Sequence, residues 1–351
     1  MRKPAELSVE DFDYALPPER IAQRPAEKRA DARLLIAPIE GGPFDHQRYN
    51  ALPELVKGDE LFVLNDTRVV PARLFGHKDT GGRVEFLVLG EEGKRPGVIR
   101  AMGRASKAIR RGMTIHVGAH CLSVEEALGE GIYLLNLPES AGDLWRFLDA
   151  EGELPLPPYI ERDNGPDSAD QKRYQTVFAA HPGSVAAPTA GLHFTPELLA
   201  DLEGRGCKSA HVTLHVGPGT FLPVRAGSLD AHQMHSERYL VSEEACSSIT
   251  QAKAEGRQIV AVGTTATRTL EGVAAAAGEL VAGQGETRLF IRPGFDFKLV
   301  DQLLTNFHLP RSTLLMLVSA LLGRERTLAT YAEALEKGYR FYSYGDGMWA
   351  K

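Results

Sequence analysis

The segment Arg73–Leu137 decides the fold, because its sequence breaks into six short pieces: RLFGHK, GRVEFLVLG, PGVIRAMG, MTIHVGAH, CLSVEEAL and GIYLLNL. Glycines punctuate the pieces, and several of them alternate apolar with polar residues. In GRVEFLVLG, for example, Val84, Phe86 and Val88 fall on one face of an extended strand. Turn signals at this spacing are typical of a small antiparallel barrel or sandwich.

The sequence on both sides of this segment predicts alternating strands and helices, as in an α/β domain. Short apolar strands are expected at Leu61–Leu64, Ile259–Val262 and Leu289–Ile291. Helices alternate with them, as at Glu243–Glu255, where a serine precedes the first turn and a glycine follows the last. A proline-rich crossing after residue 150 leads the chain back to this main domain, through an exposed loop expected at Asp163–Lys172.

Composition indicates an ordinary globular protein rather than a disordered, fibrous or membrane chain. The 351 residues suit two domains, and the net charge of −6 counts mildly against a nucleic-acid binder unless positive charge is concentrated locally. Cys121, Cys207 and Cys246 lie far apart, which argues against a disulfide framework or a thiolate zinc site. The N-terminus has no signal-peptide core, and the most apolar run, Thr313–Leu322, is about half a membrane span. We therefore expect a cytoplasmic protein.

Five loops share one composition, since all combine Gly, Pro or Thr with an ionisable residue, and several follow a predicted strand. They are Asn65–Arg68, Thr189–His193, His215–Thr220, Gly263–Arg268 and Thr305–Thr313. In an α/β domain such loops tend to gather at one edge of the sheet, which would make a single cleft. One loop of this kind is compatible with an ordinary turn, whereas five together favour an enzyme.

Two of these loops have features that suit ligand binding. The stretch PGSVAAPTAGLHFTPE, Pro182–Glu197, has small residues that let a backbone approach a ligand, and it stops at a helix that Thr195 can cap. The turn Gly263-Thr264-Thr265 joins a strand to a helix N-terminus, where free N–H groups favour an anion. The turn lacks the lysine of a P-loop, so as an isolated motif it is weak.

The spacing of the histidines does not favour a metal site, although His232 and His235 could share an ion if they were helical. His211 and His215 share a strand face but lie about 13 Å apart, too far to chelate one ion. No Gly-x-Ser-x-Gly elbow is present, and we expect no cysteine to have a Cys/His nucleophile context. We therefore expect no metal. The residues by themselves predict a two-domain enzyme with a polar, histidine-bearing cleft that tolerates anions.

Long motifs across nearly the whole chain resemble a known family. They are NDTRVVPARL, YQTVFA, PGSVAAPTAGLHFTPELL, VTLHVGPGTFLPV, MHSE, VGTTATRTLE, TNFHLPRSTLLMLVSA and the closing GYRFYSYGDGM. In this order they resemble the S-adenosylmethionine:tRNA ribosyltransferase-isomerases of queuosine biosynthesis.

The resemblance implies a fold and a reaction. The fold would be α/β: a main α/β domain (residues 1–72 and 151–351) with an inserted small antiparallel β-barrel domain (residues 73–150). The enzyme would transfer the ribosyl moiety of S-adenosylmethionine to 7-aminomethyl-7-deazaguanine at the tRNA wobble position and isomerise it. The products would be epoxyqueuosine-tRNA, adenine and methionine. S-adenosylmethionine would be consumed as a co-substrate, and no other cofactor is expected.

The chemistry that the resemblance implies suggests catalytic roles. The sulfonium acidifies the adjacent C5′ hydrogens, and a neutral histidine suits a base near pH 7, so His193 and His215 are candidates. Adenine departure needs a proton donor or polar support, for which His235 with Glu237 is suggested.

The remaining candidates would bind the substrates. Thr264, Thr265 and Arg268 could hold the methionyl carboxylate, and Asp66 with Arg68 could hold the ribose or the substrate amine. Further candidates from the same loops are Thr189, Gly191, Gly217, Gly219, Thr220, His308 and Arg311.

A tRNA substrate requires concentrated positive charge on an acidic protein. The densest basic cluster, GRASKAIRRG, carries Arg104, Lys107, Arg110 and Arg111, and we expect it to contribute with the N-terminal arginines. We expect a monomer without membrane contact. Two alternatives stay open: an RNA-binding module without catalysis, and a nucleoside or nucleotide hydrolase.

Overall fold

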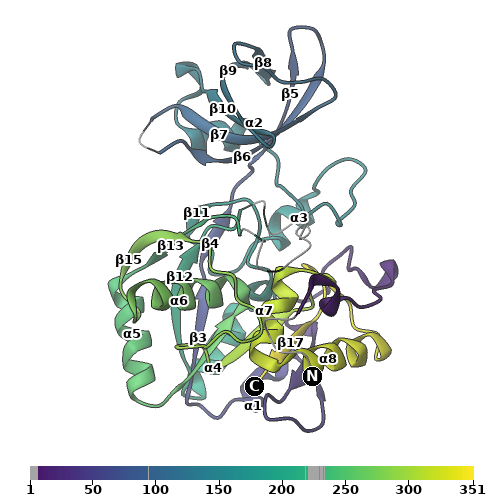
Figure 1. Ribbon diagram of the computed structural model, residues 1–351, viewed down its shortest axis with the longest axis vertical. Helices are drawn as coiled ribbons and strands as arrows, with labels where there is room; N and C mark the ends of the chain where they lie inside the picture. The colour runs from purple at the N-terminus through teal and green to yellow at the C-terminus, as the bar shows by residue number, and fades with distance from the viewer. Residues whose placement is uncertain (1–6, 94, 218, 220–228, 230–231, 233) are drawn as a thin grey trace.

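The computed structural model describes residues 7–93, 95–217, 219, 229, 232 and 234–351. Figure 1 shows a small β-barrel at one end of the molecule and a larger α/β body at the other, which contains both chain termini. The predicted fold class, an α/β domain with an antiparallel β-barrel, is confirmed. The domain boundaries at residues 72/73 and 150/151 stay a prediction.

A nine-stranded sheet forms the centre of the α/β body, in the order β15-β13-β12-β3-β14-β16-β17-β1-β2. The strands are β1 (Arg33–Ala37), β2 (Asp45–Arg48), β3 (Glu60–Asn65), β12 (Lys208–Leu214), β13 (Glu237–Val241), β14 (Gln258–Val262), β15 (Gly283–Thr287), β16 (Gln302–Asn306) and β17 (Gly347–Ala350). The central strands β12, β3, β14 and β16 run parallel, so their carboxyl ends meet at one edge. The strand order reverses direction around β3, and ligands of open α/β sheets bind at such a point.

Helices cover both faces of the sheet because the central strands are apolar on both sides. In β3, Leu61 and Val63 pack against α5, α6, α7 and α8, while Phe62 and Leu64 pack toward α1 and α4. The α-helices are α1 (Leu52–Leu55), α2 (Leu144–Glu151), α3 (Ser168–Arg173), α4 (Pro196–Gly204), α5 (Glu243–Ala254), α6 (Gly263–Ala277), α7 (Thr313–Leu322) and α8 (Arg324–Glu336). Short 3₁₀ helices are η2 (Val9–Phe12), η3 (Pro18–Arg20), η4 (Arg29–Asp31), η5 (Tyr49–Ala51), η6 (Glu139–Ala141) and η7 (Thr189–His193).

Side-chain caps set where several helices begin. The hydroxyls of Thr195, Ser242 and Ser312 each accept a hydrogen bond from a backbone N–H in the first turn of α4, α5 and α7, as their sequences predict. Among the helices that the structure describes, none is long and apolar enough to cross a membrane.

The inserted β-rich segment closes into a six-stranded antiparallel barrel with the order β10-β7-β6-β5-β8-β9. Its strands are β5 (Arg73–Lys78), β6 (Arg83–Glu91), β7 (Val98–Ala105), β8 (Thr114–Val117), β9 (His120–Gly129) and β10 (Ile132–Asn136). Val84, Phe86 and Val88 all point into the barrel core, as the alternation in their strand predicts. Closure removes the free edges that a sandwich would leave.

The chain leaves and re-enters the α/β body along a narrow two-stranded connection. β4 (Thr67–Val69) leads out and pairs in parallel with β11 (His181–Ser184), which follows the return. Arg73 and Glu153 exchange two backbone hydrogen bonds of 3.1 and 2.8 Å beside this connection. The barrel is thus attached where β3 ends, next to the carboxyl edge of the central strands.

Two local predictions are wrong. Asp163–Lys172 is not simply an exposed loop, because α3 begins within it and buried Asp170 accepts hydrogen bonds from Arg162 and from the hydroxyl of Tyr344. Leu289–Ile291 is not a strand, since the polar segment Gly283–Thr287 forms the edge strand β15 instead. In both cases a partner distant in sequence outweighs local hydropathy.

Candidate active site

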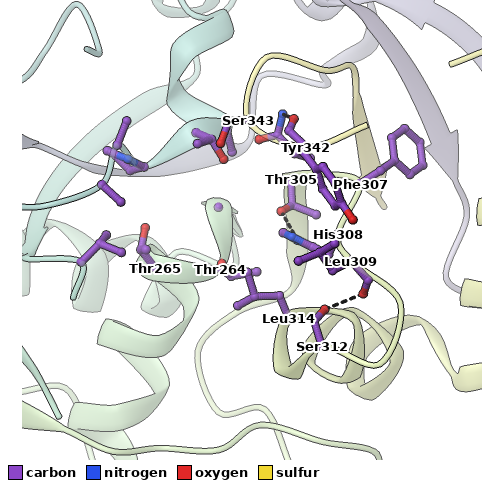
Figure 2. A pocket seen from close by; sticks show the side chains of 18 of the residues that line it. Thr264, Thr265, Thr305, Phe307, His308, Leu309, Ser312, Leu314, Tyr342 and Ser343 are labelled. Carbon is purple, nitrogen blue, oxygen red and sulfur yellow. Dashed lines mark hydrogen bonds between the residues drawn. The ribbon is translucent and has the colours of Figure 1, made fainter. Parts of the chain in front are cut away.

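A cavity of about 710 Å³ opens at the carboxyl edge of the central strands (Figure 2). Its lining comes from residues 186–190, 263–265 and 305–309, with Val216, Ser312, Leu314, Tyr159, Tyr174, Tyr342 and Ser343. Four of the five predicted loops contribute, and Asn65–Arg68 does not.

The N-terminus of α6 forms one wall of the cavity. Gly263 begins the helix at a φ of +89°, a left-handed conformation that favours glycine, and no side chain caps this end. The first backbone N–H groups therefore lack intrahelical partners and suit an anion. The Oγ1 atom of Thr265 is buried and has no hydrogen-bond partner among the described residues. This wall can accept a carboxylate and one further polar group.

The end of β16 forms the opposite wall. Thr305 Oγ1 lies 2.9 Å from His308 Nε2, as the dashed line in Figure 2 marks. Burial lowers the pKa of His308 to about 3, so this ring is neutral at pH 7. Asn306, which follows Thr305 in the sequence, also lines the cavity. Its Oδ1 atom is buried and has no partner among the described residues. This oxygen is therefore a buried acceptor in a residue that lines the cavity.

His193 lies beneath the cavity rather than in its lining. Its ring stacks on Tyr49 with centroids 4.3 Å apart, and its Nε2 atom accepts a hydrogen bond of 3.1 Å from Asn306 Nδ2. Burial, with a smaller effect of Arg340, lowers its pKa to about 3. In the same loop Thr189 does line the cavity, whereas Gly191 packs against Phe178.

His215 lies at the end of β12, directly before Val216 of the cavity lining. Its Nδ1 atom is 2.8 Å from Thr67 Oγ1, and Gly183 leaves room for the ring, since a Cβ there would lie 2.9 Å from it. Burial, followed by the charge of Arg238, lowers the pKa of His215 to about 4. The ring is therefore neutral at pH 7, and its Nε2 atom has no described partner.

Asp66 and Arg68 do not contribute to the cavity. Asp66 accepts a hydrogen bond of 2.6 Å from Thr213 and lies 3.7 Å from His181 Nε2, while Arg68 is exposed. Neither residue lines the cavity.

Glu237 and Arg268 form a buried ion pair with each other, so the structure does not place Glu237 with His235. Glu237 also accepts a hydrogen bond of 3.2 Å from the Gly217 amide. His235 is exposed, with its ring against Gly219, where a Cβ would lie 2.4 Å away. The Glu237–Arg268 pair therefore contacts the backbone of the His215–Gly217 segment, and neither residue lines the cavity.

The last two predicted positions are Arg311 and Thr220. Arg311 is exposed at a left-handed φ of 57°, with its Nε atom 3.5 Å from Asp13. Thr220 lies outside the residues that the structure describes. No group of three metal-ligating side chains occurs among the residues described.

Sequence reasoning missed several cavity residues: Asn306, Tyr159, Tyr174, Tyr342 and Ser343. The closing motif YRFYSYGDG supplies Tyr342 and Ser343, and its density of tyrosines was the available signal. Asn306 and His308 belong to the same motif, TNFH, so the motif that predicted His308 also contained Asn306.

The comparisons with known proteins identify the family of this chain. Residues 9–350 match the family model for queuosine biosynthesis proteins, so the chain belongs to that family and is an enzyme.

Its relatives have a more particular name. A protein of Anaeromyxobacter dehalogenans (strain 2CP-C) is 52% identical over 97% of this chain and 99% of its own length. A protein of Thermus thermophilus is 49% identical over 97% of this chain and 98% of its own length. Both are S-adenosylmethionine:tRNA ribosyltransferase-isomerases. The crystal structure of S-adenosylmethionine tRNA ribosyltransferase from Thermotoga maritima is similar at 33% identity and a TM-score of 0.56, covering 97% of this chain and 100% of that one.

Proposed function

We propose that this enzyme transfers the ribosyl moiety of S-adenosylmethionine to 7-aminomethyl-7-deazaguanine at the tRNA wobble position and isomerises it to epoxyqueuosine. Adenine and methionine leave as products. The observation that carries the proposal is the cavity at the carboxyl edge of the sheet, whose lining includes the N-terminus of α6 together with Thr265 and Asn306, each of which has a buried polar atom without a partner among the described residues. The similarity to relatives over 97% of the chain supports the same reaction.

The donor binds with its methionyl end between the two polar walls. Its carboxylate receives hydrogen bonds from the first amides of α6, where the helix dipole is positive. Its ammonium donates to Oδ1 of Asn306, which otherwise would be a buried acceptor without a partner. Arg268 does not serve the carboxylate in this arrangement, because Glu237 neutralises its charge.

Aromatic faces suit the rest of the donor. Tyr159 and Tyr342 both line the cavity, and their ring centroids lie 4.6 Å apart. A tyrosine face attracts a cation such as a sulfonium, and its apolar surface can stack on a nucleobase. Ser343, hydrogen-bonded to Tyr159 at 2.7 Å, fixes the position of that ring.

His215 is the better candidate for the base that removes a C5′ proton. It is neutral at pH 7, it precedes a cavity residue, and its Nε2 atom is free of described partners. The corresponding atom of His193 is already occupied by Asn306, so we assign His193 a positioning role. It holds the amide of Asn306 with the acceptor oxygen toward the cavity.

The tRNA docks partly on the loop between β7 and β8. Arg104, near the end of β7, and Lys107, Arg110 and Arg111, in the loop, are all exposed. Buried Lys78 fixes the loop by donating to the carbonyls of residues 107 and 108, at 2.7 and 3.1 Å. Within the described part of the chain the four side chains form no ion pair, so their charge is available to phosphates. A tRNA substrate also accords with a cytoplasmic monomer, which we propose as the working form.

One experiment tests the reaction. The purified enzyme is incubated with S-adenosylmethionine and tRNA that bears the aminomethyl-deazaguanine, and adenine, methionine and the modified nucleoside are quantified. The proposal requires all three products in equal amounts. Adenine release without tRNA would favour the hydrolase, and tRNA binding without turnover would favour the RNA-binding module.

A further inference from the structure

A row of polar side chains crosses the outside of the barrel, far in sequence from the cavity loops. The strand registers place Arg83 of β6 opposite His77 of β5, His77 opposite His116 of β8, and His116 opposite Cys121 of β9. Directly opposed residues of antiparallel strands share one face of a sheet. Here the face is outer, since His77 and Cys121 are exposed while Ile115 and Leu122 point into the core.

Two of these side chains, Cys121 and His116, are in hydrogen-bonding contact together with Asp79. Cys121 Sγ lies 3.4 Å from His116 Nδ1, and His116 Nε2 lies 2.6 Å from Asp79 Oδ1. A carboxylate can only accept, so Nε2 carries the hydrogen and the lone pair of Nδ1 faces the thiol. The order thiol, imidazole, carboxylate is the arrangement that activates a cysteine nucleophile.

The other two cysteines lack this arrangement. Cys207 is buried, and burial, together with the charge of Glu60, raises its pKa to about 11. Cys246 is half-buried, and its thiol donates to the carbonyl of Leu280 at 3.4 Å. Only Cys121, among the three, is both exposed and in contact with a base, so the prediction that no cysteine has a Cys/His nucleophile context is wrong for Cys121.

We propose that Cys121, activated by His116 and Asp79, is a modification site that exchanges with small disulfides of the glutathione type. The thiol proton passes to His116 Nδ1, and the thiolate attacks one sulfur of the disulfide. The Cys121–S bond to that sulfur forms as the disulfide S–S bond breaks. The departing thiolate takes the proton from His116, so Cys121 is oxidised to a mixed disulfide and one small thiol is released.

Charged and titratable groups surround the thiol. Asp79 contacts His116 on the side away from Cys121, and His77 stacks on the His116 ring with centroids 5.0 Å apart. Arg83 adds a positive charge at the other end of the row. The exposed position leaves room for a tripeptide-sized disulfide, whereas it provides no enclosed pocket for a larger substrate.

The test follows the reaction of the native protein with 4,4′-dithiodipyridine, a neutral disulfide, between pH 5.5 and 8.5. One thiol per chain should react in a fast phase that Cys121→Ser removes. At pH 6 that phase should be about fivefold or more slower in His116→Gln, because less thiolate is present. Asp79→Asn should slow it less, and Cys246→Ser is the matched control that should leave it unchanged.

Incubation with glutathione disulfide provides a second readout. Mass spectrometry should find one glutathionyl group, on Cys121, with unchanged thermal unfolding of each variant as the check on folding. The proposal is overturned if His116→Gln and Asp79→Asn both react as fast as the native protein over the whole pH range. It is equally overturned if the fast phase persists in Cys121→Ser. Neither result bears on the proposed ribosyl transfer.

Discussion

Asn306 Nδ2 lies 3.1 Å from His193 Nε2, and this contact turns the amide so that its Oδ1 atom is left without a described partner beside the cavity. The same Nδ2 atom also donates to the carbonyl of Tyr342 at 3.2 Å. The Nδ2 donor of Asn306 is thus used within the protein, whereas its Oδ1 acceptor is not. Such an amide can accept a hydrogen bond from a ligand. In the proposed mechanism His193 therefore acts through Asn306 rather than on the substrate directly.

His193→Gln and His193→Ala separate a positioning role from a role as base. Glutamine can still accept from Asn306, so its variant should keep turnover within about tenfold of the native enzyme, whereas alanine should lose more and should raise the KM for S-adenosylmethionine. Steady-state adenine release measures both constants. A complete loss of activity in His193→Gln, with folding intact, would restore His193 as the base.

His215→Gln should abolish proton removal while leaving donor binding nearly unchanged. The expected loss in kcat is about 10²-fold or more, as for other general bases. Because burial lowers the pKa of His215 to about 4, kcat of the native enzyme should show no acid limb near pH 6.5. Exchange of C5′ hydrogens with heavy water, followed by mass spectrometry of the donor, detects the step directly. Normal exchange in the variant would remove His215 from this role.

Thr265→Val tests the wall formed by α6. The substitution keeps the shape of the side chain but removes the buried Oγ1 atom that has no described partner, so the KM for S-adenosylmethionine should rise about tenfold. Thr269→Val is the matched control one helical turn on, where the hydroxyl donates to the Thr265 carbonyl at 3.0 Å and lies outside the cavity lining. Equal effects of the two substitutions would contradict a ligand contact at Thr265.

Reversing the charge of Arg110 and Arg111 should weaken tRNA binding and flatten its salt dependence. Each lost phosphate contact lowers the slope of log K against log salt by about 0.9. The control reverses Arg205 and Lys208, which are exposed at the amino end of β12, opposite the cavity edge. Filter binding over a salt series measures the slope. An unchanged slope in the Arg110/Arg111 variant would exclude the β7–β8 loop as a docking surface.

Stability should fall on acidification below pH 6.5, because of the buried histidines. The pKa of His193 and of His308 is lowered to about 3, and that of His215 to about 4. Between these values and 6.5 the unfolded chain binds protons that the folded chain does not. Each histidine therefore lowers the free energy of unfolding by about 1.4 kcal/mol per pH unit at most.

Urea unfolding at pH 7, 6 and 5 measures this dependence. His193→Gln should remove one proton from the slope, since it deletes one of the three titrating groups. Stability that stays flat from pH 7 to pH 5 would contradict the burial of these rings.

Much of the fold is readable from the sequence because its signals are local. The alternation at Val84, Phe86 and Val88 and the glycine spacing predict the barrel strands, and Thr195, Ser242 and Ser312 predict helix starts. The gathering of loops at one edge follows from parallel strands, which the apolar runs of β3 and β14 indicate. These features depend on residues a few positions apart.

The site is less readable because its chemistry depends on which side chains turn inward. The motif AGLH gives no sign that its histidine lies under the cavity, against Tyr49 and Asn306. Likewise Glu237 and Arg268, which have separate motifs, neutralise each other in the fold. Only the tertiary arrangement decides whether an ionisable residue meets a substrate or another side chain.

The place of β17 also constrains how the molecule acquires its structure. It lies between β16 and β1, so the β1–β2 hairpin joins the sheet only through residues 347–350. The amide of Arg33 and the carboxylate of Asp346, 313 residues apart, hydrogen-bond at 2.9 Å beside this junction. Loop closure over such a separation is slow, and an early hairpin waits with an unpaired edge. During synthesis the second edge of β1 is therefore among the last strand edges to be paired, because residues 347–350 are made at the end.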